Sequence, residues 1–165
     1  MRVRQVGLIV SPLVRDCPRD VQRVLKRRLR RMVCMVHGDD AIFDQFTVRV
    51  VDDTEMTRLH ETHLGLPGTT DVMSFPTDDP VEAPHTAGFG DVAVNWSQVR
   101  RQARGPTMAD ALAEATVLLV HGFAHLLGHD HTTRLQGRRM HRLERALLRR
   151  LGVADIPRPY GGDAR

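Results

Sequence analysis

Three histidines in the C-terminal half of the chain are spaced so that they could hold a metal ion. His121 and His125 are four residues apart, and His131 follows six residues later. On an α-helix, four residues correspond to about 400° of rotation and about 6 Å of rise, so the first two imidazoles project from one face. Gly128 can end the helix and let the chain turn back, which would return His131 to the same place. The spacing therefore predicts a three-histidine metal site.

Three neutral imidazoles are the ligand set of a catalytic zinc ion. They leave the fourth tetrahedral position to water, whereas a structural zinc site usually has four protein ligands. The ion would lower the pKa of that water toward neutrality and supply hydroxide. We therefore expect one zinc ion per chain, with His121, His125 and His131 acting in catalysis through the bound water. Nickel and copper also accept imidazole, so the sequence leaves the native metal open.

Glutamate is missing where a zinc peptidase would need it. The HExxH motif places its general base directly after the first histidine. That position is Gly122 here, and Glu114 lies two turns earlier on the same predicted helix, too far to substitute. Asp71 and Ser74, in a predicted strand, are candidates to assist the metal, although a solvent-facing strand position explains them more simply.

For the other histidines and for one acidic residue near the triad, the sequence gives weaker evidence of a role at the metal site. His129 should point away from the three ligands. Asp130 has two possible roles, which are to orient a ligand imidazole or to cap the following helix. The remaining histidines are scattered and are expected at the surface: His37, His60, His63, His85 and His141.

The hydrophobic pattern predicts four strands and five helices around the histidines. We expect strands at 6–10, 46–51, 71–75 and 89–95, and helices at 18–36, 54–63, 96–104, 107–127 and 132–151. An exposed loop or hairpin connection is expected at 77–87, and a loose tail from Gly152 onward. The order of elements predicts a single α+β domain over residues 1–165, a small mixed four-stranded sheet covered by about five helices.

Two of these helices have informative faces. The helix that carries His121 and His125 is apolar nearly all round from Ala111 to Leu127, so it should be central and buried, with the metal site at its end. Thr107 and Asp110 form an imperfect capping box at its start. The last helix is expected to bury Leu135, Met140, Leu143, Leu147 and Leu151.

Composition restricts the class of protein. The chain has 165 residues, 41% hydrophobic and 27% charged, which excludes disordered, collagen-like and coiled-coil proteins. The uncharged stretch from Ala115 to His129 is too short to cross a bilayer, and the N-terminus lacks the apolar run of a signal peptide. We therefore expect a cytoplasmic protein without membrane contact. Cys17 and Cys34 are expected to be free thiols, the latter on an apolar helix face.

Positive charge is clustered. The chain has 24 basic and 20 acidic residues, and Lys26 is the only lysine. Such clusters suit contacts with the phosphates of RNA, and a solvated helix face explains them equally well. The arginines concerned are Arg27, Arg28, Arg30 and Arg31, and farther along Arg134, Arg138, Arg139, Arg142, Arg145, Arg149 and Arg150.

The segment from His121 to His131 closely resembles the H-G-x-x-H-L-x-G-x-D-H signature of the YbeY family of bacterial metal-dependent endoribonucleases. Residues 70–76, T-D-V-M-S-F-P, resemble the family's T-D-V-L-S-F-P strand, and residues 90–92, G-D-V, resemble its G-D-I. The likeness extends from Val6 to about Leu151. It implies a four-stranded sheet covered by helices and zinc on the three histidines. It also implies single-strand-specific RNA cleavage, maturation of the 16S rRNA 3′ end and ribosome quality control, with the small ribosomal subunit as partner.

The chain departs from the family pattern at two positions. The family reads L-N-x-x-Y-R before its T-D-V strand and its arginine is thought to help at the active site, whereas Leu64 stands at that position here. His129 replaces the usual tyrosine. Arg58 or an arginine of the last helix could take over the missing role.

Two other functions remain open at this point. A metallopeptidase or other metal hydrolase would fit the HxxxH spacing, and a non-catalytic ribosome-binding protein with a bound metal would fit the loss of the arginine. For the nuclease, either water or the ribose 2′-OH could be the nucleophile.

Overall fold

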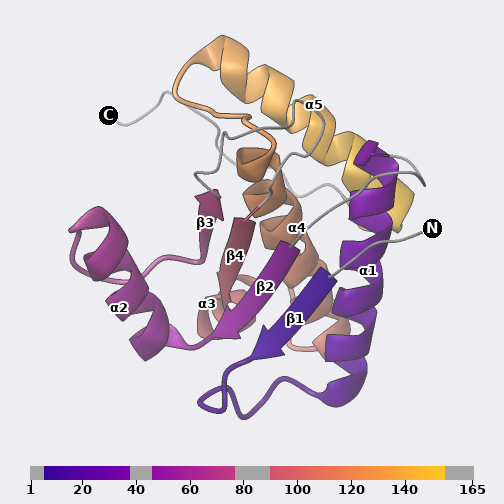
Figure 1. Cartoon of the computed structure of the whole chain (residues 1–165). Helices are drawn as coiled ribbons and strands as arrows, with labels where there is room; N and C mark the ends of the chain where they lie inside the picture. Colours follow the sequence, from indigo (N-terminus) through magenta and orange to yellow (C-terminus); the bar gives the residue numbers. More distant parts are fainter. Residues whose placement is uncertain (1–5, 38–45, 77–89, 155–165) are drawn as a thin grey trace.

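The computed structural model describes residues 6–37, 46–76 and 90–154 (Figure 1). The elements are β1 (Val6–Val10), α1 (Arg19–His37), β2 (Phe46–Val51), α2 (Asp53–Leu64), β3 (Val72–Pro76), β4 (Gly90–Asn95), α3 (Trp96–Gln102), α4 (Met108–Leu126) and α5 (Arg134–Leu151). All nine predicted elements are confirmed, with ends that differ by at most two residues. The predicted loop at 77–87, His85 and most of the predicted tail lie outside the described residues.

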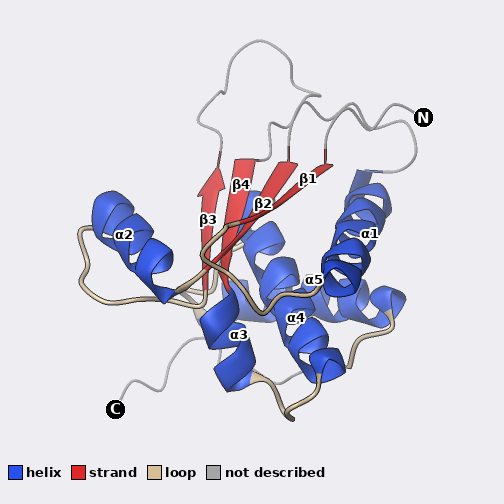
Figure 2. Cartoon of the chain, turned by 90° about the horizontal axis from the view of Figure 1, so that it is seen from below, coloured by secondary structure: helices blue, strands red, loops and turns tan. Residues whose placement is uncertain are grey.

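The four strands form one mixed sheet in the order β1-β2-β4-β3. β1, β2 and β4 are parallel, and β3 runs antiparallel to β4 at the edge, with Ser74 opposite Val92. Helices α1, α4 and α5 lie on one side of the sheet, and α2 lies beside β3 toward the other (Figures 1 and 2). The predicted α+β architecture is therefore confirmed.

Helix α4 is the centre of the core. Its Leu118, Val120 and Phe123 are completely buried, and Phe123 packs on Phe46 of β2 with the ring centroids 5.3 Å apart. The predicted capping box is present in full at Thr107, because the side chains of Thr107 and Asp110 each accept a hydrogen bond from the other's backbone nitrogen. A buried, capped helix is a rigid support for the histidines at its C-terminal end.

The buried stripe of α5 differs from the prediction at its first position. Leu135 is 59% exposed, so its assignment to the core is wrong. It lies five residues before Met140, and five residues turn a helix by about 500°, which places Leu135 about 140° away from Met140. The buried residues of α5 are Gly137, Met140, Glu144, Leu147, Leu148 and Leu151.

Two arginines of α1 serve the packing of the helices. Arg28, which is partly buried, donates from Nη1 to Oγ1 of Thr116 at 2.6 Å and to the carbonyl of Leu112 at 3.3 Å, both on α4. Arg31 donates to the carbonyl of Arg150 in α5 at 3.0 Å. These contacts fix α1 against both neighbouring helices.

Asn95 connects the end of β4 to three neighbouring segments. Its side chain is fully buried, and its Oδ1 caps α3 by accepting from the backbone nitrogens of Ser97 and Gln98 at 3.1 and 3.3 Å. Its Nδ2 donates to Oδ1 of Asp53 at 2.8 Å and to Oγ1 of Thr69 at 3.0 Å. The network holds the start of α2 and the segment that leads into β3.

We expect Asn95→Ala to lower the free energy of unfolding by about 2–3 kcal/mol, because it removes a helix cap and leaves buried polar partners unsatisfied. Urea unfolding of the two proteins measures this difference. A loss below about 0.5 kcal/mol would show that the cap and the network contribute little.

The cysteines are free thiols, as predicted. Cys17 is buried, and burial raises the pKa of its thiol to about 11, with smaller contributions from Asp16 and Asp20. Cys34 is partly buried on α1. None of the described helices combines the length and apolarity that a membrane crossing requires.

Candidate metal centre

The end of α4 brings the three predicted ligands together. His121 and His125 lie one turn apart on the helix, which ends at Leu126. Gly128 adopts φ +82°, a conformation that favours glycine, and its nitrogen donates to the carbonyl of His125 at 2.9 Å. The nitrogen of His129 then donates to the carbonyl of Ala124 at 3.0 Å. The chain reverses through these bonds and carries His131 back to the helix end.

The geometry of the three imidazoles suits a metal ion. One ligand nitrogen from each of His121, His125 and His131 lies within 4.8 Å of the others. The Nε2 atoms of His121 and His125 are 3.2 Å apart. Two nitrogens bound tetrahedrally to zinc at 2.0–2.1 Å are separated by about 3.3 Å, so the pair is spaced for this coordination. The donor set and its spacing therefore fit zinc.

The surroundings of His125 favour its neutral form. Burial lowers the pKa of this imidazole, and the neighbouring His121 and His131 lower it further. A neutral ring with a free lone pair is the form that binds a metal ion. His129 is not part of the ligand cluster among the described residues, as predicted.

Glu144 of α5 fixes the orientation of His121. Its Oε1 accepts from Nδ1 of His121 at 2.8 Å, which leaves Nε2 of that ring to face His125. Glu144 is 3% exposed, and its second oxygen lies 3.8 Å from Nδ1 of His141. A carboxylate behind a metal-binding histidine fixes the tautomer and makes the ring a stronger ligand.

Sequence reasoning missed Glu144, although a signal was present. It lies four residues after Met140 and three before Leu147, which places a carboxylate in the buried stripe of an amphipathic helix. A carboxylate at such a position needs a buried partner.

Asp130 acts on the backbone of the turn. Its Oδ1 accepts from the backbone nitrogen of His131 at 2.7 Å and its Oδ2 from the hydroxyl of Thr132 at 2.8 Å, and these bonds lower its pKa. The cap of α5 is Thr133, so the capping role considered for Asp130 is wrong. Asp130 fixes the turn that carries the third histidine.

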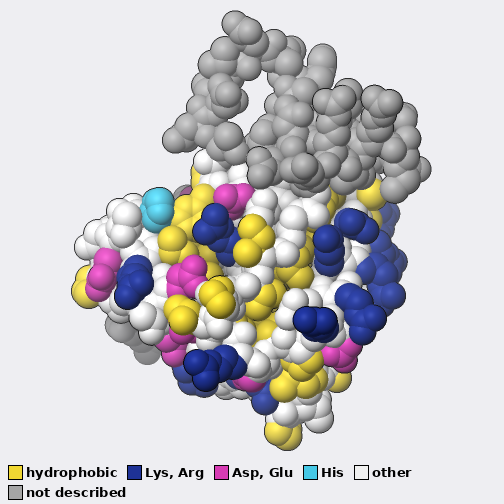
Figure 3. Space-filling model, turned by 60° about the horizontal axis from the view of Figure 1, so that its bottom comes forward, with side chains coloured by type: hydrophobic (Ala, Val, Ile, Leu, Met, Phe, Trp, Pro, Cys, Tyr) yellow, Lys and Arg dark blue, Asp and Glu magenta, His cyan; other side chains and the backbone are white. Residues whose placement is uncertain are grey.

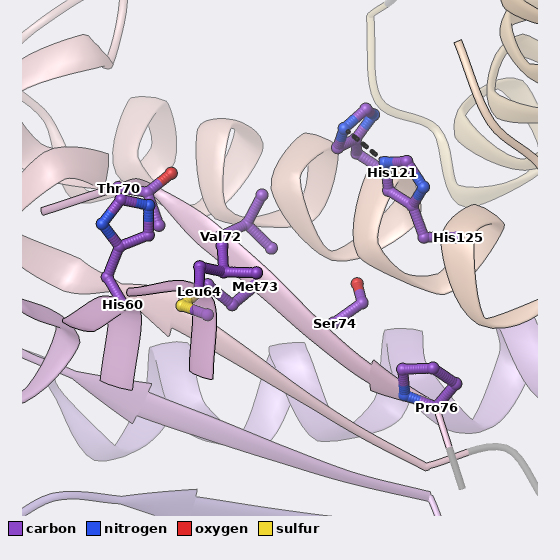
Figure 4. A pocket seen from close by; sticks show the side chains of 9 residues that line it. All are labelled: His60, Leu64, Thr70, Val72, Met73, Ser74, Pro76, His121 and His125. Carbon is purple, nitrogen blue, oxygen red and sulfur yellow. Dashed lines mark hydrogen bonds between the residues drawn. The ribbon is translucent and has the colours of Figure 1, made fainter. Parts of the chain in front are cut away.

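A pocket of about 400 Å³ opens beside the histidines. Figure 4 shows His121 and His125 at one end, His60 toward the other, and β3 along the length between them. The hydroxyl of Ser74 points into this space and donates to the carbonyl of Gly122 at 2.9 Å. The lining residues are His60, Leu64, Thr70, Val72, Met73, Ser74, Pro76, His121 and His125.

The predicted helper residues lie in different places. Ser74 lines the pocket, whereas Asp71 and Arg58 are outside its lining. The carbonyl of Asp71 accepts from the nitrogen of Asn95 at 2.8 Å, at the end of β3 away from Pro76. Arg58 is exposed on α2, about 200° around the helix from His60.

His60 is the second residue that sequence reasoning missed. It was expected at the surface, but it is partly buried and lines the pocket, with Nδ1 3.1 Å from the carbonyl of Gly68. Leu64 lies one turn later on α2 and lines the same wall. The spacing of four residues is a signal that both share one face, but the sequence does not show which face of α2 meets β3.

Gly122 lets α4 approach the sheet closely. A Cβ atom at this position would lie 2.8 Å from Cγ1 of Val92 and 3.2 Å from Oγ of Ser74. Val92 is completely buried and cannot move away freely. The position at which a zinc peptidase has its general base is therefore occupied by glycine here, and the packing leaves no room there for a side chain.

The fold and the site together define a small α+β protein with a cluster of three histidines that could hold a metal ion, beside an open pocket. The family model described as endoribonuclease YbeY matches residues 15–152. The chain therefore belongs to the endoribonuclease YbeY family.

Curated relatives support this assignment. An endoribonuclease YbeY from a Chelativorans species is 38% identical over 125 residues, which cover 74% of this chain and 73% of the relative. One from Halorhodospira halophila is 40% identical over 120 residues, covering 70% and 74%. Among solved structures, the solution structure of a Thermotoga maritima protein matches with a TM-score of 0.54 and 19% identity, over 93% of this chain and 99% of the other. That likeness supports the fold.

Proposed function

We propose that this chain is a zinc-dependent endoribonuclease that cuts single-stranded RNA, acting in maturation of the 16S rRNA 3′ end and in ribosome quality control. The observation that carries the proposal is the cluster of three imidazoles, spaced for one ion, at the end of an open pocket. Family membership supplies the substrate class. The small ribosomal subunit is the proposed partner, and the cytoplasm of a bacterial cell is where this substrate lies.

The residues of the site have distinct roles in this proposal. His121, His125 and His131 would hold one zinc ion per chain, which supplies a Lewis acid and an activated water when bound. Glu144 holds the ring of His121 in its binding orientation, and Asp130 holds the turn before His131. The pocket wall of α2 and β3 would receive the nucleotides on either side of the scissile phosphate.

Four side chains are candidates to assist the reaction: Ser74, His60, Asp71 and Arg58. The first two line the pocket, so they can contact RNA that reaches the histidines. In its imidazolium form the ring of His60 donates Nδ1–H to the carbonyl of Gly68 and can donate Nε2–H to a phosphate oxygen. It lies one helical turn from Leu64, where the family pattern has an arginine. We therefore favour His60 over Arg58 as the residue that takes the role of the arginine in the family pattern.

His60→Ala is expected to reduce RNA cleavage about 10-fold to 100-fold, because one hydrogen bond to a charged phosphate is lost. Arg58→Ala, on the same helix outside the pocket, is the matched comparison and should change the rate much less. Single-turnover cleavage and metal content are measured for both proteins, and the metal content should not change. A larger loss for Arg58→Ala would assign the role to Arg58.

Analysis of the cleavage products tests the proposed function and its chemistry together. The purified, zinc-loaded protein is incubated with end-labelled single-stranded RNA, and both new ends are identified. Products that end in a 2′,3′-cyclic phosphate would show attack by the ribose 2′-OH, whereas their absence throughout the time course would favour attack by water. Steady hydrolysis of peptides without RNA cleavage would overturn the proposal and favour the metallopeptidase.

A non-catalytic ribosome-binding protein fits the structure less well. Three histidines lie together beside an open pocket, whereas a structural zinc site usually has four protein ligands. His131→Ala separates the two functions, because a structural site predicts loss of folding and a catalytic site mainly loss of activity.

A further inference from the structure

Helices α1 and α5 concentrate the positive charge of the chain. Each contains seven basic residues and one acidic residue, so each carries a formal charge of +6, whereas the whole chain carries +4. The acidic residue of α5 is Glu144, which is buried against His121. Asp20, in the first turn of α1, is therefore the only exposed acidic residue of these two helices.

On each helix, five of the seven basic residues form one stripe. On α5, Arg134, Arg138, Arg142, Arg145 and Arg149 follow one another at intervals of three or four residues, and all five are exposed. At about 100° per residue they span only about 80° of the helix circumference, over a length of about 22 Å. On α1, the corresponding exposed stripe consists of Arg19, Arg23, Lys26, Arg27 and Arg30. Figure 3 shows Lys and Arg side chains gathered on the right, where α1 lies in Figure 1.

The two helices that carry the stripes are held together by hydrogen bonds, and the α5 stripe begins close in sequence to His131. Arg31 donates to the carbonyl of Arg150, and Arg28 ties α1 to α4, so the helices are fixed relative to one another. The α5 stripe starts at Arg134, three residues after the ligand His131. Within the described part of the chain, no ion pair engages the five side chains of the α1 stripe.

The composition of the stripes indicates which form of RNA they suit. Surfaces that bind single strands combine positive charge with aromatic side chains on which the bases stack. Neither α1 nor α5 contains a phenylalanine, tyrosine or tryptophan. A rigid surface of arginines without stacking partners matches the regularly spaced phosphates of a duplex, which are recognised by charge and shape.

We propose that the arginine stripes of α1 and α5 form a docking surface for duplex RNA, separate from the pocket that receives the single strand. This inference rests on the proposed function for its substrate class. RNA with a helix next to an unpaired segment would bind through its helix to the stripes. The unpaired segment would then reach the histidines, because the α5 stripe begins three residues after His131.

The test measures binding of a blunt RNA duplex of about 20 base pairs, longer than the stripe, by fluorescence anisotropy at several salt concentrations. The full-length, metal-loaded protein is compared with the triple variant Arg27→Gln, Arg30→Gln, Arg149→Gln. A control variant removes the same charge elsewhere, through Arg15→Gln, Arg49→Gln and Arg104→Gln, all at exposed positions. Circular dichroism and thermal unfolding of both variants check that they are folded.

We expect the stripe variant to bind the duplex at least about tenfold more weakly than wild type. The number of phosphate contacts derived from the salt dependence of its affinity should fall by about three. The control variant should bind the duplex at most about threefold more weakly than wild type. Equal losses in the two variants would overturn the proposal, since they would show a general charge effect. Unchanged duplex affinity in the stripe variant would also overturn it and would favour an acidic protein as the occupant. This experiment measures binding and not cleavage. A failure of the proposed nuclease function would therefore appear in the separate cleavage assay, in which the single-stranded RNA would stay intact.

Discussion

Glu144→Gln is expected to weaken zinc binding about 10-fold to 100-fold, and Glu144→Ala at least as much, because the carboxylate that orients His121 is lost. The wild-type contact is a 2.8 Å hydrogen bond between two nearly buried groups, with the side chains 13% and 4% exposed. Glutamine retains an oxygen that can accept from Nδ1, but without the negative charge that strengthens the bond. Competition with a zinc chelator of known affinity measures the change.

Glu114→Gln is the matched control for this substitution. Glu114 is also a buried carboxylate, at 4% exposure, but it lies seven residues before His121, about 10 Å along α4. We expect its replacement to leave zinc affinity within about threefold of wild type. If both variants bind zinc equally well, Glu144 does not support the metal centre.

Gly122→Glu is expected to prevent stable folding, with a loss of about 3 kcal/mol or more, because it overpacks the contact between α4 and the sheet and buries a charge. The added Cβ atom alone would lie 2.8 Å from Cγ1 of Val92. Gly122→Ala should cost less, about 1–2 kcal/mol, since alanine is the better helix former and offsets part of the overpacking. Thermal and urea unfolding rank the two variants.

The Gly122→Glu substitution also tests the hypothesis that the chain is a metallopeptidase. Gly122→Glu creates the HExxH sequence, so a protein that was only missing its general base would become a peptidase. A folded, zinc-bound Gly122→Glu protein that hydrolyses peptides would contradict this account of the helix-to-sheet contact. Gly122→Ala controls for the loss of glycine, because it adds the Cβ atom without a carboxylate.

Local patterns in the sequence predicted the elements and the clustering of the three histidines. The spacing of His121 and His125 depends only on helix geometry, and Gly128 marks the turn that returns His131. The capping box at Thr107 is likewise a contact between residues three apart. Each of these features is fixed by neighbours in the chain, so a single sequence is enough to predict it.

Contacts between distant segments were not predictable in the same way. The position of Glu144 behind His121 depends on how α5 packs on α4, and the place of His60 in the pocket depends on which side of α2 meets β3. Arg28 was assigned to a basic surface stripe, but its partner Thr116 lies 88 residues away. The strand order likewise follows from tertiary packing, since charge and hydrophobicity along β3 do not specify its antiparallel partner.

We infer that the three histidines form the metal centre of a ribonuclease. The most direct test combines metal analysis with cleavage of end-labelled single-stranded RNA by wild-type protein, chelator-treated protein and His125→Ala. We predict close to one zinc ion per chain and RNA cleavage for wild type, and loss of cleavage in the other two samples. His129→Ala, next to the site but outside the ligand cluster, should retain both zinc and activity. Cleavage that persists in metal-free His125→Ala would contradict the claim.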